Sequence, residues 1–122
     1  MNTVNVYYNP KACGLSVFAS IEQPDLSYEY NILLVLKHDK SGKLFWAQDR
    51  GCSCPVPFED YWFEDENHTN LDILNKSTLG GFRLTLTCFE GPVDKKQALE
   101  IKVSKHLKAK KRQLVKGSRS KL

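Results

Sequence analysis

Cysteine is the residue type with the clearest chemical potential in this 122-residue sequence, and two of the four cysteines flank a single serine in GCSCPVPFEDY. A C-x-C pair such as Cys52 and Cys54 supplies two zinc ligands, whereas a structural zinc site takes four. Cys13, Cys88 and His68 would have to complete the set. A redox pair is more typical as C-x-x-C at the start of a helix, where the thiol pKa falls. We therefore expect no metal or cofactor, and keep a small zinc-binding module as an alternative.

The same stretch has a structural interpretation. Proline cannot donate a hydrogen bond inside a sheet or helix, so Gly51, Pro55 and Pro57 indicate a break in regular structure. A rigid turn here would deliver Phe58 and Tyr61 to the core or to a partner. This interpretation needs no bound ligand, and we prefer it.

No grouping of residues predicts catalysis. His38, His68 and His106 are far apart in sequence, and no spacing typical of a Ser-His-Asp or Cys-His site is present. Asp39 and Asp49 flank a predicted hairpin and are interpreted as turn and strand-end residues. There is no glycine-rich phosphate-binding loop. We expect that the protein is not an enzyme.

Charge is distributed unevenly along the chain. Residues 95–122 contain eleven Lys or Arg and one acid, a net charge of +10, whereas residues 1–94 contain seven basic and thirteen acidic residues, a net charge of −6. A basic segment of this kind favours phosphate contacts that are salt-dependent and weakly sequence-specific. The predicted nucleic-acid-binding residues are Lys102, Lys105, Lys108, Lys110, Lys111, Arg112, Lys116 and Arg119, with Tyr7, Tyr8, Phe18 and Trp46 as candidates for base stacking. The alternative is a solubilising tail.

An acidic segment rich in aromatic residues precedes this basic region. Carboxylates interleaved with aromatic side chains are typical of protein-binding surfaces, in which aromatic anchors bury area and charge steers a basic partner. The predicted protein-binding residues are Glu59, Asp60, Tyr61, Trp62, Phe63, Glu64, Asp65 and Glu66. Alternatively, this exposed loop folds against the protein's own basic helix or is simply hydrated.

Hydrophobic periodicity predicts the elements that position these residues. Alternation over residues 15–22 predicts a strand with one face formed by Leu15, Val17, Ala19 and Ile21. Residues 28–38 and 43–49 read as a hairpin around DKSG, with Gly42 in a left-handed turn position and residues 32–36 apolar on both faces.

Three further elements are predicted downstream. Residues 71–77 read as a short helix, capped by Thr69 or Asn70 and ended by Gly80 and Gly81. Residues 82–89 alternate and predict a fourth strand with an apolar face formed by Phe82, Leu84, Leu86 and Cys88. Asp94 is predicted to cap a long helix whose apolar stripe consists of Leu99, Val103 and Leu107.

Together these elements predict an α+β fold, a small antiparallel sheet of about four strands with a short helix and a long basic C-terminal helix. Residues 1–107 are expected to form a single domain, and residues 108–122 the basic helix end and a flexible tail. The N-terminus lacks the pattern of a signal peptide, and no stretch approaches the roughly 18 apolar residues of a membrane span. We expect a cytoplasmic protein with no membrane partner.

The stretch DRGCSCPVPFEDY resembles the hallmark of an uncharacterised family of small bacteriophage and prophage proteins with a GCSCPxPFE motif. Asp49, Gly51, Cys52, Cys54, Pro55, Pro57, Phe58 and Glu59 carry this resemblance, and the opening YNPKACGL and the predicted hairpin are also similar. The resemblance implies a phage accessory protein that acts in the cytoplasm of the bacterial host. It implies no reaction.

Two functions follow. The first is a non-enzymatic accessory protein that binds and modulates a host protein or nucleoprotein complex, for example as an anti-defence inhibitor of a CRISPR effector. The alternative is a DNA- or RNA-binding protein that uses the basic C-terminal helix.

Overall fold

A computed structural model describes residues 5–24, 26–52 and 56–119, with side chains as far as Ala109. A short 3₁₀ helix (η1) at Pro10–Cys13 precedes the sheet. Strands β1 (Leu15–Glu22), β2 (Glu29–His38), β3 (Leu44–Cys52) and β6 (Asp72–Leu74) form an antiparallel sheet in the order β1-β2-β3-β6. Strands β4 (Phe63–Asp65) and β5 (His68–Thr69) form a separate hairpin, and helices α1 (Leu79–Cys88) and α2 (Val93–Arg119) follow. The predicted α+β fold is confirmed.

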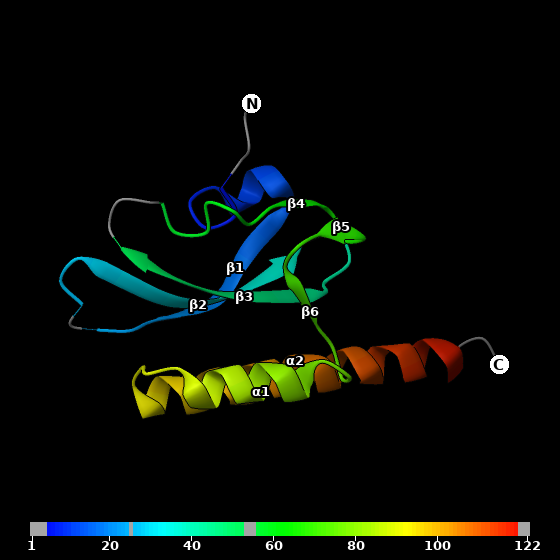
Figure 1. Ribbon diagram of the computed structural model, residues 1–122. Coiled ribbons are helices and arrows are strands. Elements are labelled where there is room, and N and C mark those ends of the chain that lie inside the picture. Colours follow the sequence, from blue (N-terminus) through cyan, green and yellow to red (C-terminus); the bar gives the residue numbers. More distant parts are fainter. Residues whose placement is uncertain (1–4, 25, 53–55, 120–122) are drawn as a thin grey trace.

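The sheet has a different layer on each face. Figure 1 shows α1 and α2 side by side under one face, with the N-terminal segment and the β4–β5 hairpin over the other. The predicted hairpin of β2 and β3 is confirmed, and Gly42 in its turn has a φ of 72°. Residues 32–36 of β2 are all buried, because alternate side chains enter the two layers.

Strand β1 does not present the single apolar face predicted for it. A β-bulge between Val17 and Ala19 shifts the register against β2, so the alternation of side chains changes there. Leu15 therefore packs in the layer with Ile32, whereas Ile21 packs in the helical layer with Leu33.

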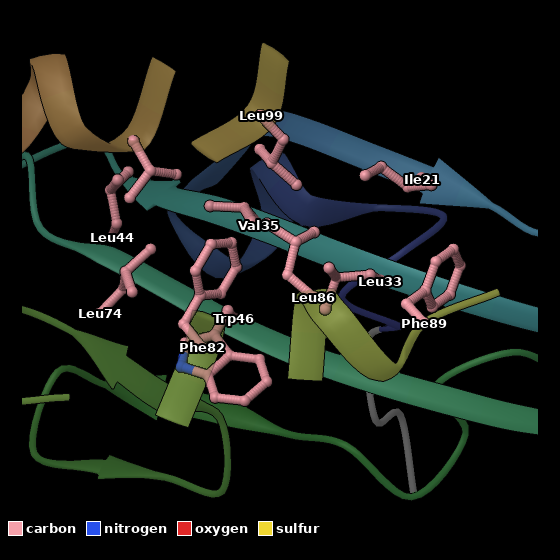
Figure 2. Close-up of a cluster of buried hydrophobic side chains, with 11 residues drawn as sticks. Ile21, Leu33, Val35, Leu44, Trp46, Leu74, Phe82, Leu86, Phe89 and Leu99 are labelled. Atoms are coloured by element: carbon pink, nitrogen blue, oxygen red, sulfur yellow. The ribbon is translucent and has the colours of Figure 1, made fainter. Parts of the chain in front are cut away.

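The predicted strand over residues 82–89 is wrong, because this segment is helix α1. Phe82, Leu86 and Phe89 follow the helical spacing i, i+4, i+7 and are buried, and Figure 2 shows them facing Leu33 and Val35 of β2. Leu84, which alternation would place beside Phe82, is 67% exposed. A run of apolar residues and threonines satisfied both periods, and burial against the sheet selects the helical one.

The short helix predicted over residues 71–77 is also wrong. Residues 72–74 form strand β6 on the edge of β3, and Leu44 pairs with Leu74. Gly80 and Gly81 do not end a helix but lie in the first turn of α1. Pairing with β3 accounts for the difference, because a three-residue strand is stabilised by its neighbour rather than by its own sequence.

Helix α2 packs as its apolar stripe predicts. Leu99 and Val103 are buried and Leu107 is half-buried against the same layer. The helix begins at Val93, so Asp94 lies in its first turn and is not the predicted cap. It extends to Arg119, into the region expected as tail, and its C-terminal turns project past the sheet in Figure 1. The predicted division into a domain of residues 1–107 and a basic helix end with a flexible tail at residues 108–122 stays a prediction. Among the described residues, no helix is both long and apolar enough to cross a membrane.

Candidate binding surfaces

The acidic segment is an ordered hairpin rather than a simple exposed loop. Tyr61 packs against Phe58 and donates a hydrogen bond of 2.7 Å to the Gln48 carbonyl, and Phe63 lies edge-on to Phe45 with 5.3 Å between ring centroids. These two aromatic residues therefore belong to the core. Trp62, at 43% exposure, is the aromatic residue of the predicted set that stays at the surface. Two of the predicted protein-binding residues, Tyr61 and Phe63, are thus partly buried, and whether the set binds a protein stays a prediction.

Polar contacts hold the backbone around Trp62. Asn70 accepts a hydrogen bond from the Trp62 amide at 2.9 Å and donates one to the Asp60 carbonyl at 2.9 Å. The Thr69 hydroxyl donates to the Trp62 carbonyl at 2.8 Å. An exposed indole on a fixed backbone loses little conformational entropy when it enters a partner's pocket, which suits it as an anchor.

Two of the acidic residues serve the hairpin itself. Asp65 accepts hydrogen bonds from the Asn67 and His68 amides and lies 2.9 Å from the His68 ring. Glu66 forms a 2.9 Å ion pair with Lys43 in the β2–β3 turn, and the hydrogen bond from Lys43 lowers the pKa of Glu66. Glu59, Asp60 and Glu64 are exposed and form no ion pair with any described residue, so they are the carboxylates available to a partner.

The Asp65–His68 pair predicts a measurable titration. The hydrogen bond between them raises the pKa of His68 above 6.5 and lowers that of Asp65. The pair stabilises the hairpin fully between about pH 3.8 and pH 6.5, and this contribution is lost as the pH rises through the raised pKa of His68 or falls through the lowered pKa of Asp65. An NMR titration of the His68 ring should show a midpoint above 6.5, which returns to about 6.5 in Asp65→Asn. Equal midpoints in the two proteins would contradict the pairing.

The basic surface lies on α2, in the layer on the other side of the sheet. Lys102 is exposed, but its ammonium donates a 2.7 Å hydrogen bond to the Phe18 carbonyl and lies 4.6 Å from the Phe18 ring centroid. Lys105 and Lys108 are exposed, and neither forms an ion pair within the described part of the chain. The side chains predicted at Lys110, Lys111, Arg112, Lys116 and Arg119 lie outside the described residues.

The candidates for base stacking have structural partners. Trp46 is 9% exposed and packs edge-on to Phe82, and Tyr7 stacks on Phe58. Phe18 lies edge-on to His106 and beneath Lys102. Tyr8, at 65% exposure, is the candidate that remains accessible, and it lies on the N-terminal segment above the other face of the sheet.

Asp49 holds the backbone at Phe58, a residue of the GCSCPxPFE motif, through a hydrogen bond. One carboxylate oxygen of Asp49 accepts hydrogen bonds from the Phe58 amide at 2.7 Å and from the Tyr30 hydroxyl at 3.1 Å. Burial, supported by the Asp49 contact, raises the pKa of Tyr30 to about 12. Phe58 has a φ of 61°, which is unusual outside glycine, and its side chain is fully buried. These contacts give Asp49 and Phe58 a structural role.

One expectation for this stretch needs correction. Regular structure does not stop at Gly51, because β3 continues to Cys52, opposite Glu29. Gly51 is needed where it lies, since a Cβ atom there would come within 2.8 Å of the Tyr30 hydroxyl oxygen. The predicted rigid turn falls largely on residues 53–55, which lie outside the described part of the chain.

The structure does not gather those predicted zinc ligands that it describes, namely Cys13, Cys52, His68 and Cys88. Cys52 and Cys88 are exposed, although Cys88 was expected on a buried face, and Cys13 is half-buried with a pKa raised by burial. No three His, Cys, Asp or Glu residues cluster as a metal site within residues 5–24, 26–52 and 56–109. Cys54 lies outside these ranges.

The histidines serve separate elements. His38 contacts the Ser41 hydroxyl at 2.7 Å, and His106 of α2 contacts the Gly42 carbonyl at 2.9 Å. His68 pairs with Asp65 in the hairpin. The His38–Ser41 contact lies within the tight turn between β2 and β3, where the Ser41 amide also donates to the His38 ring.

Comparison with known proteins gives one match. The family model described as Domain of unknown function (DUF7574) matches residues 4–112. The chain belongs to the DUF7574 family. No curated protein and no solved structure matches it. The DUF7574 match includes the GCSCPxPFE motif, the acidic hairpin and α2 as far as Arg112. It therefore covers more of the chain than the stretches that carry the resemblance to phage proteins. The DUF7574 description names no activity.

Proposed function

We propose that this protein is a non-enzymatic accessory protein that binds and modulates a protein or nucleoprotein complex. The observation that carries the proposal is the separation of two charged surfaces by the sheet, with the acidic hairpin over one face and α2 under the other. Among the described residues no ion pair joins the hairpin to α2, since Glu66 pairs with Lys43 and Glu100 of α2 pairs with Arg83 of α1. Both surfaces are thus available to partners of opposite charge.

The resemblance of residues 49–61 to small phage proteins supports a bacterial host target. A defence nuclease such as a CRISPR effector holds nucleic acid on a basic surface, which is the charge that Glu59, Asp60 and Glu64 complement. Trp62 supplies an aromatic anchor beside these carboxylates. The proposed activity is inhibition by occupation of such a surface in the host cytoplasm.

Capture from a lysate of the bacterial host tests this proposal. The tagged full-length protein should retain a host protein at near-equal stoichiometry, and treatment of the lysate with nuclease should leave recovery unchanged if the contact is direct. Loss of every partner after nuclease treatment would replace the proposal with the alternative below. Recovery of no partner in either condition would contradict both.

A second candidate function is nucleic-acid binding through α2. Lys105 and Lys108 favour it, because they are exposed and form no ion pair within the described residues. Binding to a labelled oligonucleotide should weaken steeply with salt, and Lys105→Glu with Lys108→Glu should reduce the log–log salt slope by about two, or roughly 0.9 per lost phosphate contact. An unchanged slope would remove these two residues from the interface.

A further inference from the structure

A groove separates β1 from α2 on the helical side of the sheet. It has a volume of about 240 Å³, and its walls include Ala19, Ser20 and Ile21 from β1 and Lys95, Ala98 and Lys102 from α2. Strand β1 is the outermost strand of the sheet, so its outer backbone edge, beside this groove, has no neighbouring strand among the described residues. An apolar floor, an open strand edge and two lysines thus meet in one place.

We propose that this groove binds an extended acidic segment of a partner protein, which adds to the edge of β1 as a further strand. Free strand edges supply backbone hydrogen bonds to an extended peptide, and the pockets beside the edge select alternate side chains. The bulge lies between Val17 and Ala19, so residues 19–22 form the regular part of the edge available for pairing. Ser20 is exposed there.

Charge complementarity selects an acidic occupant. Side chains of an added strand that face α2 would lie beside Lys95 and Lys102. Glu22 does not oppose them, because alternation from Ile21, which packs toward the helices, places Glu22 on the opposite face. Lys95 is exposed and forms no ion pair among the described residues.

The same features disfavour other occupants. A bulge in an edge strand limits self-pairing, and Lys102, which reaches over from α2, already occupies the Phe18 carbonyl at that bulge. A second copy of β1 would also bring a second pair of lysines to the contact. An acidic strand replaces that repulsion with ion pairs, so the edge is open to one class of partner and protected against copies of itself.

A synthetic peptide tests the groove directly. The probe is a labelled seven-residue peptide that alternates glutamate and valine, titrated into the ¹⁵N-labelled full-length protein. Amide shifts are expected in residues 19–22 and around Lys95 and Ala98, with slower hydrogen exchange of the outward β1 amides. A peptide with lysine in place of glutamate, and one with a central proline, should both bind much more weakly. Equal binding of the proline peptide would overturn strand addition, because proline removes a ladder hydrogen bond.

A matched pair of variants separates the groove from general attraction to α2. Lys95→Glu, which lines the groove, should weaken peptide binding about fivefold, whereas Lys108→Glu makes the same charge change outside it and should stay within about twofold. Equal losses in both, or displacement of the peptide by a second copy of the protein, would overturn the proposal. This inference rests on the proposed function in one respect, that the partner is a protein. If the peptide titration fails, the proposed binding of a host protein through the acidic hairpin still stands.

Discussion

Phe82→Ala is expected to lower the free energy of unfolding by about 3–5 kcal/mol. The Phe82 side chain is fully buried and lies edge-on to Trp46, with 5.5 Å between ring centroids. It joins α1 to the sheet in the helical layer (Figure 2). Truncation leaves a cavity between these elements, which chemical denaturation monitored by circular dichroism would measure.

Leu84→Ala is the matched control. Leu84 lies two residues away on the same helix and is 67% exposed, so its replacement should change stability by no more than about 0.5 kcal/mol. In a strand, Phe82 and Leu84 would share a buried face and both variants would be strongly destabilised. Similar large losses in the two variants would therefore contradict the helical assignment of this segment.

Asp49→Ala is expected to cost about 2–3 kcal/mol of unfolding free energy, because partly buried donors lose a charged acceptor. The Phe58 amide and the Tyr30 hydroxyl both donate to Asp49, and the left-handed backbone of Phe58 depends on this support. Asp60→Ala, at an exposed carboxylate that forms no ion pair with the described residues, is the control and should be nearly neutral. Chemical denaturation of both variants measures this difference. Equal unfolding midpoints for Asp49→Ala and Asp60→Ala would contradict the structural role of Asp49.

Tyr30 provides a second readout of the same contact. Its pKa of about 12 in the folded protein exceeds the ordinary value of 10.0. The neutral hydroxyl therefore contributes to stability below pH 10, and this contribution is lost as the pH rises through 12. In Asp49→Ala the pKa of Tyr30 should fall toward 10.0, as followed by NMR of the ring.

Local pattern was sufficient for the central hairpin and for α2. The apolar run at residues 32–36 fits a strand covered on both faces, and Gly42 marks its turn. The spacing of Leu99, Val103 and Leu107 fits a helix docked on one side. In each case the local period and the final environment agree, so no distant contact was needed to choose between structures.

Elsewhere distant contacts decided the outcome. Residues 82–89 satisfy both periods, and their place against β2 selects the helix. The bulge in β1 depends on its register with β2. Residue type also did not distinguish Trp62, which is exposed, from Phe63, which packs on Phe45. The groove beside β1 could not be predicted, because nothing local brings Lys102 to Phe18 across more than eighty residues.

Capture of a host partner by charge variants tests most directly whether the two separated surfaces are binding surfaces. One bait carries Glu59→Lys and Glu64→Lys on the hairpin, and the other carries Lys105→Glu and Lys108→Glu on α2. These positions are exposed and form no ion pairs with other described residues, so folding should be preserved. The account predicts that, from nuclease-treated lysate, the hairpin bait loses the partner retained by the wild-type protein. Retention of that partner at wild-type recovery by both baits would contradict it.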